Sequence, residues 1–191
     1  MSRPVRRMPW ARHEAVRGFT LIEWMITVAL LLLLVTLAAP SVRELIATQR
    51  LQSIHGALVT DLQFARSEAV RQRRSLRFEV GGNDTMTCYI VFAPGVSGNC
   101  LCTRAPGSAC NGASEEFRTV QVLRSTGITL SATSSRGPDA TFEDISGRSE
   151  PGDLRIDLAS AVRGQLRVTV NGTGRVSSCS PDGSVRQVAR C

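Results

Sequence analysis

The strongest constraint in this sequence is an uncharged run of 19 residues, from Trp24 to Val42. A helix rises about 1.5 Å per residue, so this run would extend roughly 28 Å, close to the apolar thickness of a bilayer. The run therefore predicts a membrane-spanning helix, and the remaining chain must fold outside the membrane.

Glu23 places a carboxylate directly before this run. A charged side chain in lipid is strongly unfavourable unless it finds a partner, and such residues in membrane segments usually serve a function. We therefore take Glu23 as a candidate functional residue.

The stretch from Arg17 to Glu23, RGFTLIE, follows a basic segment. It resembles the processing and assembly signal of type IV pilins and type II secretion pseudopilins, except that Trp24 replaces the smaller aliphatic residue usual there. The resemblance implies that prepilin peptidase cleaves between Gly18 and Phe19 and that the new amine of Phe19 is methylated. It also implies that Glu23 pairs with the Phe19 amine of a neighbouring subunit during assembly.

An ordinary secretory signal, cut after Ala39, is the alternative interpretation of the same segment. Its cleavage site requires small residues, but Leu37 is large and Pro40 would directly follow the cut. The motif at Gly18 therefore favours the pilin signal.

The charge distribution predicts how the chain is oriented in the membrane. All 23 basic residues are arginine, against 16 acidic residues, and the net charge is +7. Residues 1–18 contain five arginines and one glutamate, so they hold +4 of this charge and leave +3 on the rest. Positive charge before a membrane segment keeps that side in the cytoplasm, so we expect the C-terminal part to be periplasmic.

Six cysteines follow the membrane run, on the side where disulfides form. Cys179 and Cys191 bracket a short turn-rich segment and are the first expected pair, while the other four would pair locally in an order that the spacing leaves open. A zinc site is disfavoured because the close pair lacks the usual ligand spacing and no histidine is near. The other four cysteines are Cys88, Cys100, Cys102 and Cys110.

Beyond the membrane run, apolar residues recur every three or four positions, which predicts one face of a helix. We expect a single helix from about Phe19 to Arg74, half in lipid and half amphipathic. Pro40 removes one backbone hydrogen bond inside it, and we expect a kink there. The stripe consists of Ala47, Leu51, Ile54, Leu58, Leu62, Ala65 and Ala69.

The end of this helix, DLQFARSEAVR at residues 61–71, resembles the "LQxARSEA" stretch of GspH/FimT minor pilins. We expect the side chains of Arg66 and Arg71 to be solvated. The stretches 142–148 and 168–175 resemble later strands of the same family.

After Arg74 the apolar period changes to two, which predicts strands. Residues 76–80 and 85–92 form an expected hairpin, and Asn171-Gly172 between two strand runs predicts a second hairpin turn. Residues 93–116 predict a long loop whose order depends on its cysteines. Further expected strands cover 117–124, 128–132, 154–158, 165–170 and 175–178.

Catalytic chemistry finds little support in the sequence. His13 lies in the leader, so His55 is the remaining histidine, and its place beside the stripe predicts a helix-surface side chain. No phosphate-binding glycine loop, nucleophile elbow or two-histidine metal motif occurs. The sequence thus predicts a protein that is no enzyme and uses no cofactor or metal.

The fold class that we expect is α+β, a pilin fold with a long N-terminal helix on an antiparallel β-sheet domain. Its parts are a cytoplasmic leader (1–18), a membrane helix (19–42) and a periplasmic domain (43–191). The expected function is that of a minor pilin or pseudopilin of the GspH/FimT family. It would be held in the inner membrane and assembled with other pilins or pseudopilins into a type IV pilus or a type II secretion pseudopilus.

DNA binding during natural transformation is the alternative function. The C-terminal part is basic, and DNA-binding relatives carry a Gly-Arg-x-Arg motif that Gly174-Arg175 only half preserves. Arg175, Arg186 and Arg190 are the candidate contacts, and they would act through phosphate electrostatics because no aromatic residue follows Phe142.

Overall fold

The computed structural model describes residues 19–191, except for the side chains of residues 37–40. Helix α1 (Leu21–Gln72) is followed in this part of the chain by strands β1 to β9 and a short 3-10 helix, η1 (Arg124–Thr126). Two compact units divide the chain, one ending at Pro40 and one running from Ser41 to Cys191. The long helix expected from the sequence is confirmed, with ends two residues shorter on each side.

Both ends of α1 have local chemistry that explains where they lie. At the start, the hydroxyl of Thr20 accepts a hydrogen bond from the backbone N–H of Glu23 at 3.3 Å, as an N-cap residue does. At the end, Arg73 adopts a left-handed φ of 50°, and the N–H of Arg74 donates to the carbonyl of Ala69 at 3.1 Å. This is a Schellman ending with arginine in the place that glycine usually takes.

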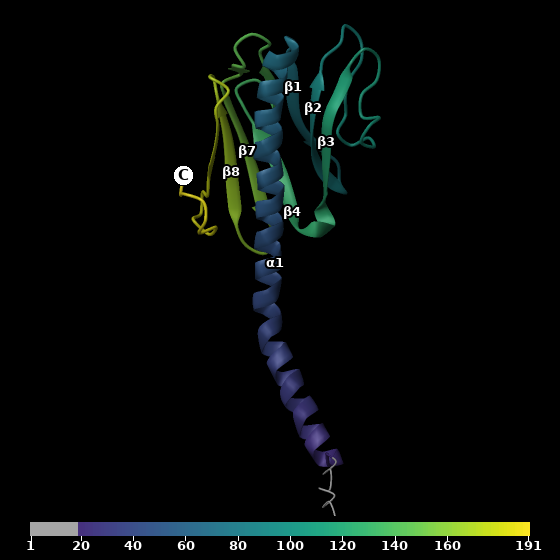
Figure 1. The fold of residues 1–191 in the computed structure, drawn as a ribbon, viewed down its shortest axis with the longest axis vertical. Helices are drawn as coiled ribbons and strands as arrows, with labels where there is room; N and C mark the ends of the chain where they lie inside the picture. Colours follow the sequence, from purple (N-terminus) through teal and green to yellow (C-terminus); the bar gives the residue numbers. More distant parts are fainter. Residues whose placement is uncertain (1–18) are drawn as a thin grey trace, which may run out of the picture. The chain divides into compact units, whose positions relative to one another are not determined.

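The strands form two antiparallel sheets (Figure 1). The first has the order β3-β2-β1-β5-β6, and the second has the order β4-β7-β8-β9. The first sheet contains β1 (Leu76–Gly82), β2 (Met86–Ala93), β3 (Glu115–Leu123), β5 (Asp139–Phe142) and β6 (Ser149–Glu150). The second contains β4 (Ile128–Thr133), β7 (Asp153–Ser160), β8 (Gln165–Asn171) and β9 (Val176–Cys179).

Most of the predicted strands are confirmed, including the β1–β2 and β8–β9 hairpins. Residues 142–148, which resemble a later strand of the family, do not form one here, because Phe142 ends β5 and the chain then turns. The N–H of Glu143 donates to the carbonyl of Arg148 at 2.9 Å, and Gly147 has a left-handed φ of 62°. Strand β5, directly before this turn, has only four residues and was not predicted as a strand of its own.

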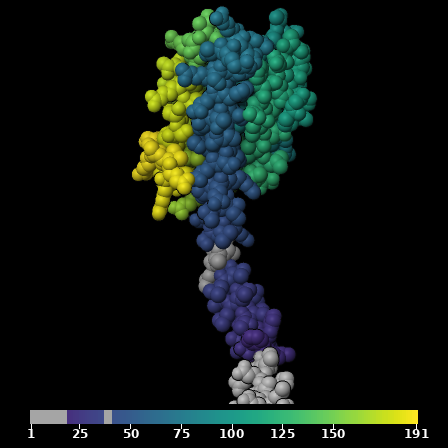
Figure 2. All heavy atoms as spheres, viewed as in Figure 1, coloured from purple at the N-terminus to yellow at the C-terminus, as the bar shows by residue number. Residues whose placement is uncertain are grey.

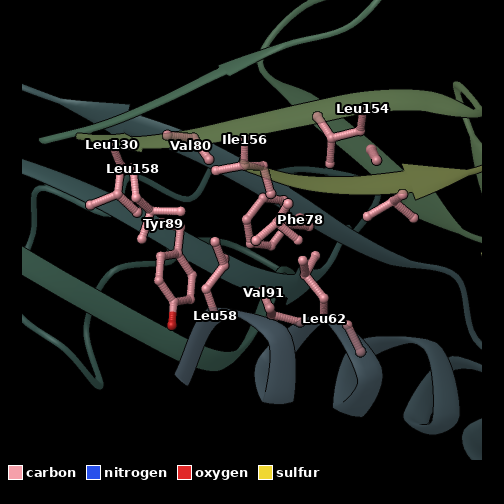
Figure 3. Close-up of a cluster of buried hydrophobic side chains, with 14 of the residues drawn as sticks. Leu58, Leu62, Phe78, Val80, Tyr89, Val91, Leu130, Leu154, Ile156 and Leu158 are labelled. Carbon is pink, nitrogen blue, oxygen red and sulfur yellow. The ribbon is translucent and has the colours of Figure 1, made fainter. Parts of the chain in front are cut away.

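The predicted apolar stripe on the second half of α1 forms the centre of the core (Figure 3). Leu51, Leu58 and Leu62 are fully buried against side chains from both sheets, whereas Ile54 is only partly buried. The opposite face of this helix half is exposed at the surface (Figure 2). The C-terminal segment flanks it on one side, and the region of β2 and β3 flanks it on the other. The amphipathic half of the helix thus packs against two sheets. The sequence predicted a β-sheet domain but not its division into two sheets.

Strand β2 is buried on both faces. Tyr89 and Val91 belong to the main core, whereas Cys88, Ile90 and Phe92 form a second cluster beneath the loop between β2 and β3. Two disulfides hold this loop, as its cysteine content predicted. The side chain of Gln121 on β3 also donates to the carbonyls of Cys102 and Arg104, at 2.8 and 2.7 Å.

Candidate functional site

The N-terminal half of α1 exposes its large apolar side chains. Phe19, Leu21, Trp24 and the aliphatic residues up to Val35 are all exposed. Among the described residues, no single helix satisfies the length and hydropathy of a membrane span, but Leu21–Thr36 and Ser41–Gln72 satisfy them together. A hydrophobic helix of this kind is consistent with anchoring in the inner membrane.

Phe19 lies two residues before the start of this helix, and Glu23 lies in its first turn. The carboxylate of Glu23 is exposed and has neither a hydrogen bond nor an ion pair within residues 19–191. Gly18, the other residue of the predicted cleavage site, lies outside the described residues. So does the side chain of Pro40, and the predicted kink remains a prediction.

Asp61, on the second half of α1, is a carboxylate that the fold itself satisfies. It is buried, and its Oδ2 accepts the hydroxyl proton of Tyr89 at 2.8 Å. Its Oδ1 lies 3.2 Å from Nε of Arg118 on β3. Burial, together with the hydrogen bond to Asp61, raises the pKa of the Tyr89 hydroxyl, which therefore stays a donor.

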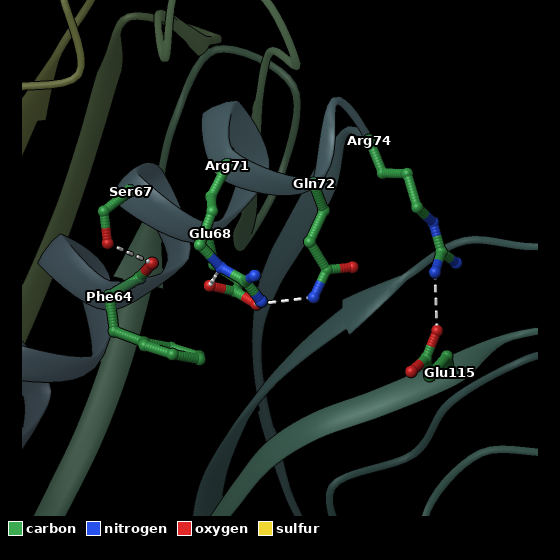
Figure 4. Close-up of polar contacts among 7 residues, drawn as sticks. All are labelled: Phe64, Ser67, Glu68, Arg71, Gln72, Arg74 and Glu115. Carbon is green, nitrogen blue, oxygen red and sulfur yellow. Dashed lines mark hydrogen bonds and ion pairs between the residues drawn. The ribbon is translucent and has the colours of Figure 1, made fainter.

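Glu68, two turns further on, is also buried, and both of its partners belong to the same helix (Figure 4). Nε of Arg71 donates to its Oε2 at 2.7 Å, and the side-chain amide of Gln72 donates to Oε1. The hydrogen bond from Arg71 lowers the pKa of Glu68. Figure 4 also shows Arg74 pairing with Glu115 of β3 at 2.6 Å.

Arg66 and Arg71 are both exposed, as predicted, but each also has a partner within the described chain. The three-residue spacing from Glu68 to Arg71 is a sequence signal for their ion pair. No such signal exists for Arg66, whose Nε donates to the carbonyl of Gly147 at 3.2 Å, 81 residues away. That contact ties the end of α1 to the turn after β5.

All six cysteines form disulfides, and Cys179 is joined to Cys191, the pair expected from the sequence. The other four form Cys88–Cys102 and Cys100–Cys110, a choice that the spacing left open. The zinc alternative does not fit these residues, because zinc ligation requires free thiolates. No group of metal-ligating side chains occurs elsewhere in the described residues.

The three arginines proposed for DNA contact lie in different places. Arg175 lines a groove of about 660 Å³ beside Arg66 and Ser146, whereas Arg186 lines one of about 390 Å³ beside Glu44 and Gln52. The side chain of Arg190 lies against Gly183. The fold therefore separates Arg175 from Arg186 and Arg190, which both belong to the C-terminal segment, and DNA binding remains a prediction.

His55 is not the surface side chain that the sequence predicted. It is half-buried, and its Nε2 is buried without a hydrogen-bond partner among the described residues. Burial lowers the pKa of this imidazole, because the charged form loses water.

Comparison with known proteins gives two matches to family models. The model of the type II transport protein GspH matches residues 56–174, and that of the prokaryotic N-terminal methylation motif matches residues 15–39. No curated protein sequence matches the chain.

The chain is also similar in structure to the type IV minor pilin FimU of Pseudomonas aeruginosa strain PAO1. One crystal structure of FimU superposes with a TM-score of 0.50 and 23% identity, covering 72% of this chain and 96% of FimU. A second crystal form gives a TM-score of 0.47 and 22% identity, covering 70% and 98%. The first of these likenesses shows the fold, a long helix packed on antiparallel sheets as in minor pilins.

The GspH model spans more than half of the chain, from the second half of α1 to the β8–β9 turn. The methylation motif precedes it in the sequence. The chain belongs to the family of the type II transport protein GspH, whose members are structural pseudopilins and not enzymes.

Proposed function

We propose that this chain is a minor pseudopilin of a type II secretion system. Prepilin peptidase removes residues 1–18 on the cytoplasmic side and the amine of Phe19 is methylated. Residues 19–42 then anchor the protein in the inner membrane, with residues 43–191 in the periplasm. From there it enters the pseudopilus with other pseudopilins. The observation that carries this proposal is the methylation motif at 15–39 ahead of the GspH match at 56–174 in the same chain.

The start of α1 suits cleavage before Phe19. The helix begins at Leu21, and its cap comes from the hydroxyl of Thr20, so both features remain after the cut. The side chain of Phe19 is 77% exposed and makes no part of a core. Removal of the leader therefore leaves the first turn of the helix intact.

Glu23 is proposed to direct assembly. Its carboxylate has no partner within the described chain, and an unpaired ion in an apolar setting is unfavourable by several kcal/mol. The methylated amine of Phe19 on a neighbouring subunit supplies the cation that would neutralise it.

A periplasmic location of residues 43–191 agrees with the three disulfides of this region. Disulfides persist in the oxidising periplasm and are rare in the cytoplasm. The positive charge of residues 1–18 favours the same orientation.

Mass spectrometry of the protein extracted from membranes tests the processing step. We expect a mature N-terminus at methylated Phe19, and we expect Gly18→Val to leave the leader attached. A mature N-terminus at Pro40, or normal processing of Gly18→Val, would contradict the proposal.

A further inference from the structure

One end of the unit Ser41–Cys191 is built from the first helix residues, 41–52, and three loops tied to them. Nη1 of Arg50 donates to the carbonyl of Thr126 at 3.4 Å, next to η1. Arg163, in the loop between β7 and β8, lies 3.6 Å from Glu44. The amide of Gln52 donates to Gln187 of the C-terminal segment at 2.9 Å. We call this end the basal face; its loops are grouped at the beginning of this helix half in Figure 1.

The basal face has an excess of positive charge. It holds six exposed arginines against three carboxylates, Glu44, Asp182 and Asp84. Asp84 belongs to the β1–β2 turn, where Nε of Arg124 donates to the carbonyl of Asn83 at 3.0 Å. Within the described residues, Glu44 and Arg163 form its single ion pair, and the other ion pairs lie elsewhere. The six arginines are Arg43, Arg50, Arg124, Arg163, Arg186 and Arg190.

Large apolar side chains are exposed beside these arginines. Leu45 on the helix, Leu123 at the end of β3 and Val162 in the β7–β8 loop are each more than half exposed. Val162 directly precedes Arg163 in the chain. A groove of about 390 Å³ is lined by Leu45, Arg163 and Arg186.

In the sequence, the helix residues of this face directly follow the uncharged run. The uncharged run ends at Val42, and Arg43 is the next residue of the same helix. Basic side chains near a membrane surface are attracted to anionic headgroups, each by about 1 kcal/mol, and neighbouring apolar side chains can enter the interface.

We propose that the basal face binds the headgroups of anionic phospholipids at the surface of the membrane that anchors the chain. This inference rests on the proposed membrane anchoring. Before assembly, the contact holds the periplasmic domain against the bilayer, and extraction of the subunit breaks it. A lipid surface fits better than nucleic acid, because the exposed leucine and valine side chains find an apolar layer only in lipid.

The fragment Ser41–Cys191 serves for the test, because every residue of the hydrophobic core lies within it. We expect it to co-sediment with vesicles of phosphatidylcholine that contain phosphatidylglycerol, and not with phosphatidylcholine alone. Added salt weakens this binding. Replacing Arg43, Arg163 and Arg186 together by glutamine lowers the affinity by about 100-fold.

A matched control removes the same charge from exposed positions away from the basal face: Arg73, Arg148 and Arg175, all to glutamine. We expect its vesicle affinity to change by less than about 3-fold, because few of these charges reach the bilayer within a Debye length. Circular dichroism melting curves establish that both variants are folded.

Several results would overturn the proposal. Equal losses in the two triple variants would show a diffuse effect of net charge, and equal binding to both vesicle types would exclude headgroup recognition. Binding to duplex DNA but not to vesicles, lost on replacing the basal arginines, would assign the face to nucleic acid. Processing is measured separately, by identifying the mature N-terminus. A negative vesicle result therefore does not contradict the pseudopilin proposal.

Discussion

The two halves of α1 belong to one helix but differ in how far their apolar side chains are buried. In residues 21–36 apolar side chains occur all around the helix, and they are exposed. In residues 41–72 the buried apolar side chains follow one stripe, at Leu51, Leu58 and Leu62. The second half finds its apolar partners within its own chain, whereas the first half has to find them in lipid or in other subunits.

The carboxylates of the two halves repeat this difference. Asp61 is satisfied by Tyr89 and Arg118, and Glu68 by Arg71 and Gln72. Glu23 has no such partner in the described chain. A polar group in an apolar setting needs a partner from somewhere, so its absence at Glu23 directs attention to a second molecule.

The largest effect is expected at Glu23. Glu23→Ala should still be cleaved and methylated, but its incorporation into pseudopili should fall below detection, because the neighbouring amine loses its counter-ion. Immunoblots of sheared filaments and mass spectrometry of the membrane pool measure the two steps. Glu44→Ala, an exposed helix carboxylate in the other half, serves as the control and should assemble. Normal incorporation of Glu23→Ala would remove this residue from the mechanism.

Substituting one leucine in each half of α1 tests whether only the second half contributes to the stability of the β domain. Leu62→Ala should lower the free energy of unfolding of the β domain by about 2–5 kcal/mol, because it leaves a cavity beneath both sheets. Leu33→Ala, in the exposed half, should change it by less than about 0.5 kcal/mol. Urea unfolding of the full chain in detergent, followed by circular dichroism, compares the two. Similar losses in both variants would mean that the halves are not independent.

Removing the donor to Asp61 gives a smaller effect. Tyr89→Phe should lower the free energy of unfolding by about 1–3 kcal/mol, since a buried carboxylate loses a hydrogen bond. In the double variant with Asp61→Asn, the loss should be smaller than the sum of the single losses. Strict additivity in this cycle would show that the two side chains do not stabilise one another.

The smallest effect is a pH dependence from His55. Burial lowers its folded-state pKa below the unfolded value of about 6.5, so the unfolded chain binds the proton more readily. The contribution is fully present above pH 6.5 or so and declines as the pH falls toward the folded-state pKa. His55→Gln should therefore show a flatter stability profile between about pH 7 and 5 in urea titrations. An identical slope in both proteins would refute this assignment.

Local patterns accounted for much of the fold. The motif at residues 17–23, the stripe from Leu51 to Ala69 and the alternation in β1, β7 and β8 each depend on residues close in sequence. The spacing of apolar residues in these segments indicates which side chains share a face, without knowledge of any tertiary contact. The pairing of Cys179 with Cys191 closes a short loop and was predictable for the same reason.

Only the tertiary structure decided how these elements combine. The division into two sheets and the short strand β5 depend on which distant segments meet. The same holds for Asp61 with Tyr89, for Arg66 with Gly147, and for the arginines of the basal face, which come from four separate segments. The bonds Cys88–Cys102 and Cys100–Cys110 are local, but four neighbouring cysteines allow more than one local pairing, and only the tertiary structure chose between them. Sequence periodicity reports the environment of a side chain along its own element, but the identity of its partner depends on the packing of elements far apart in the chain.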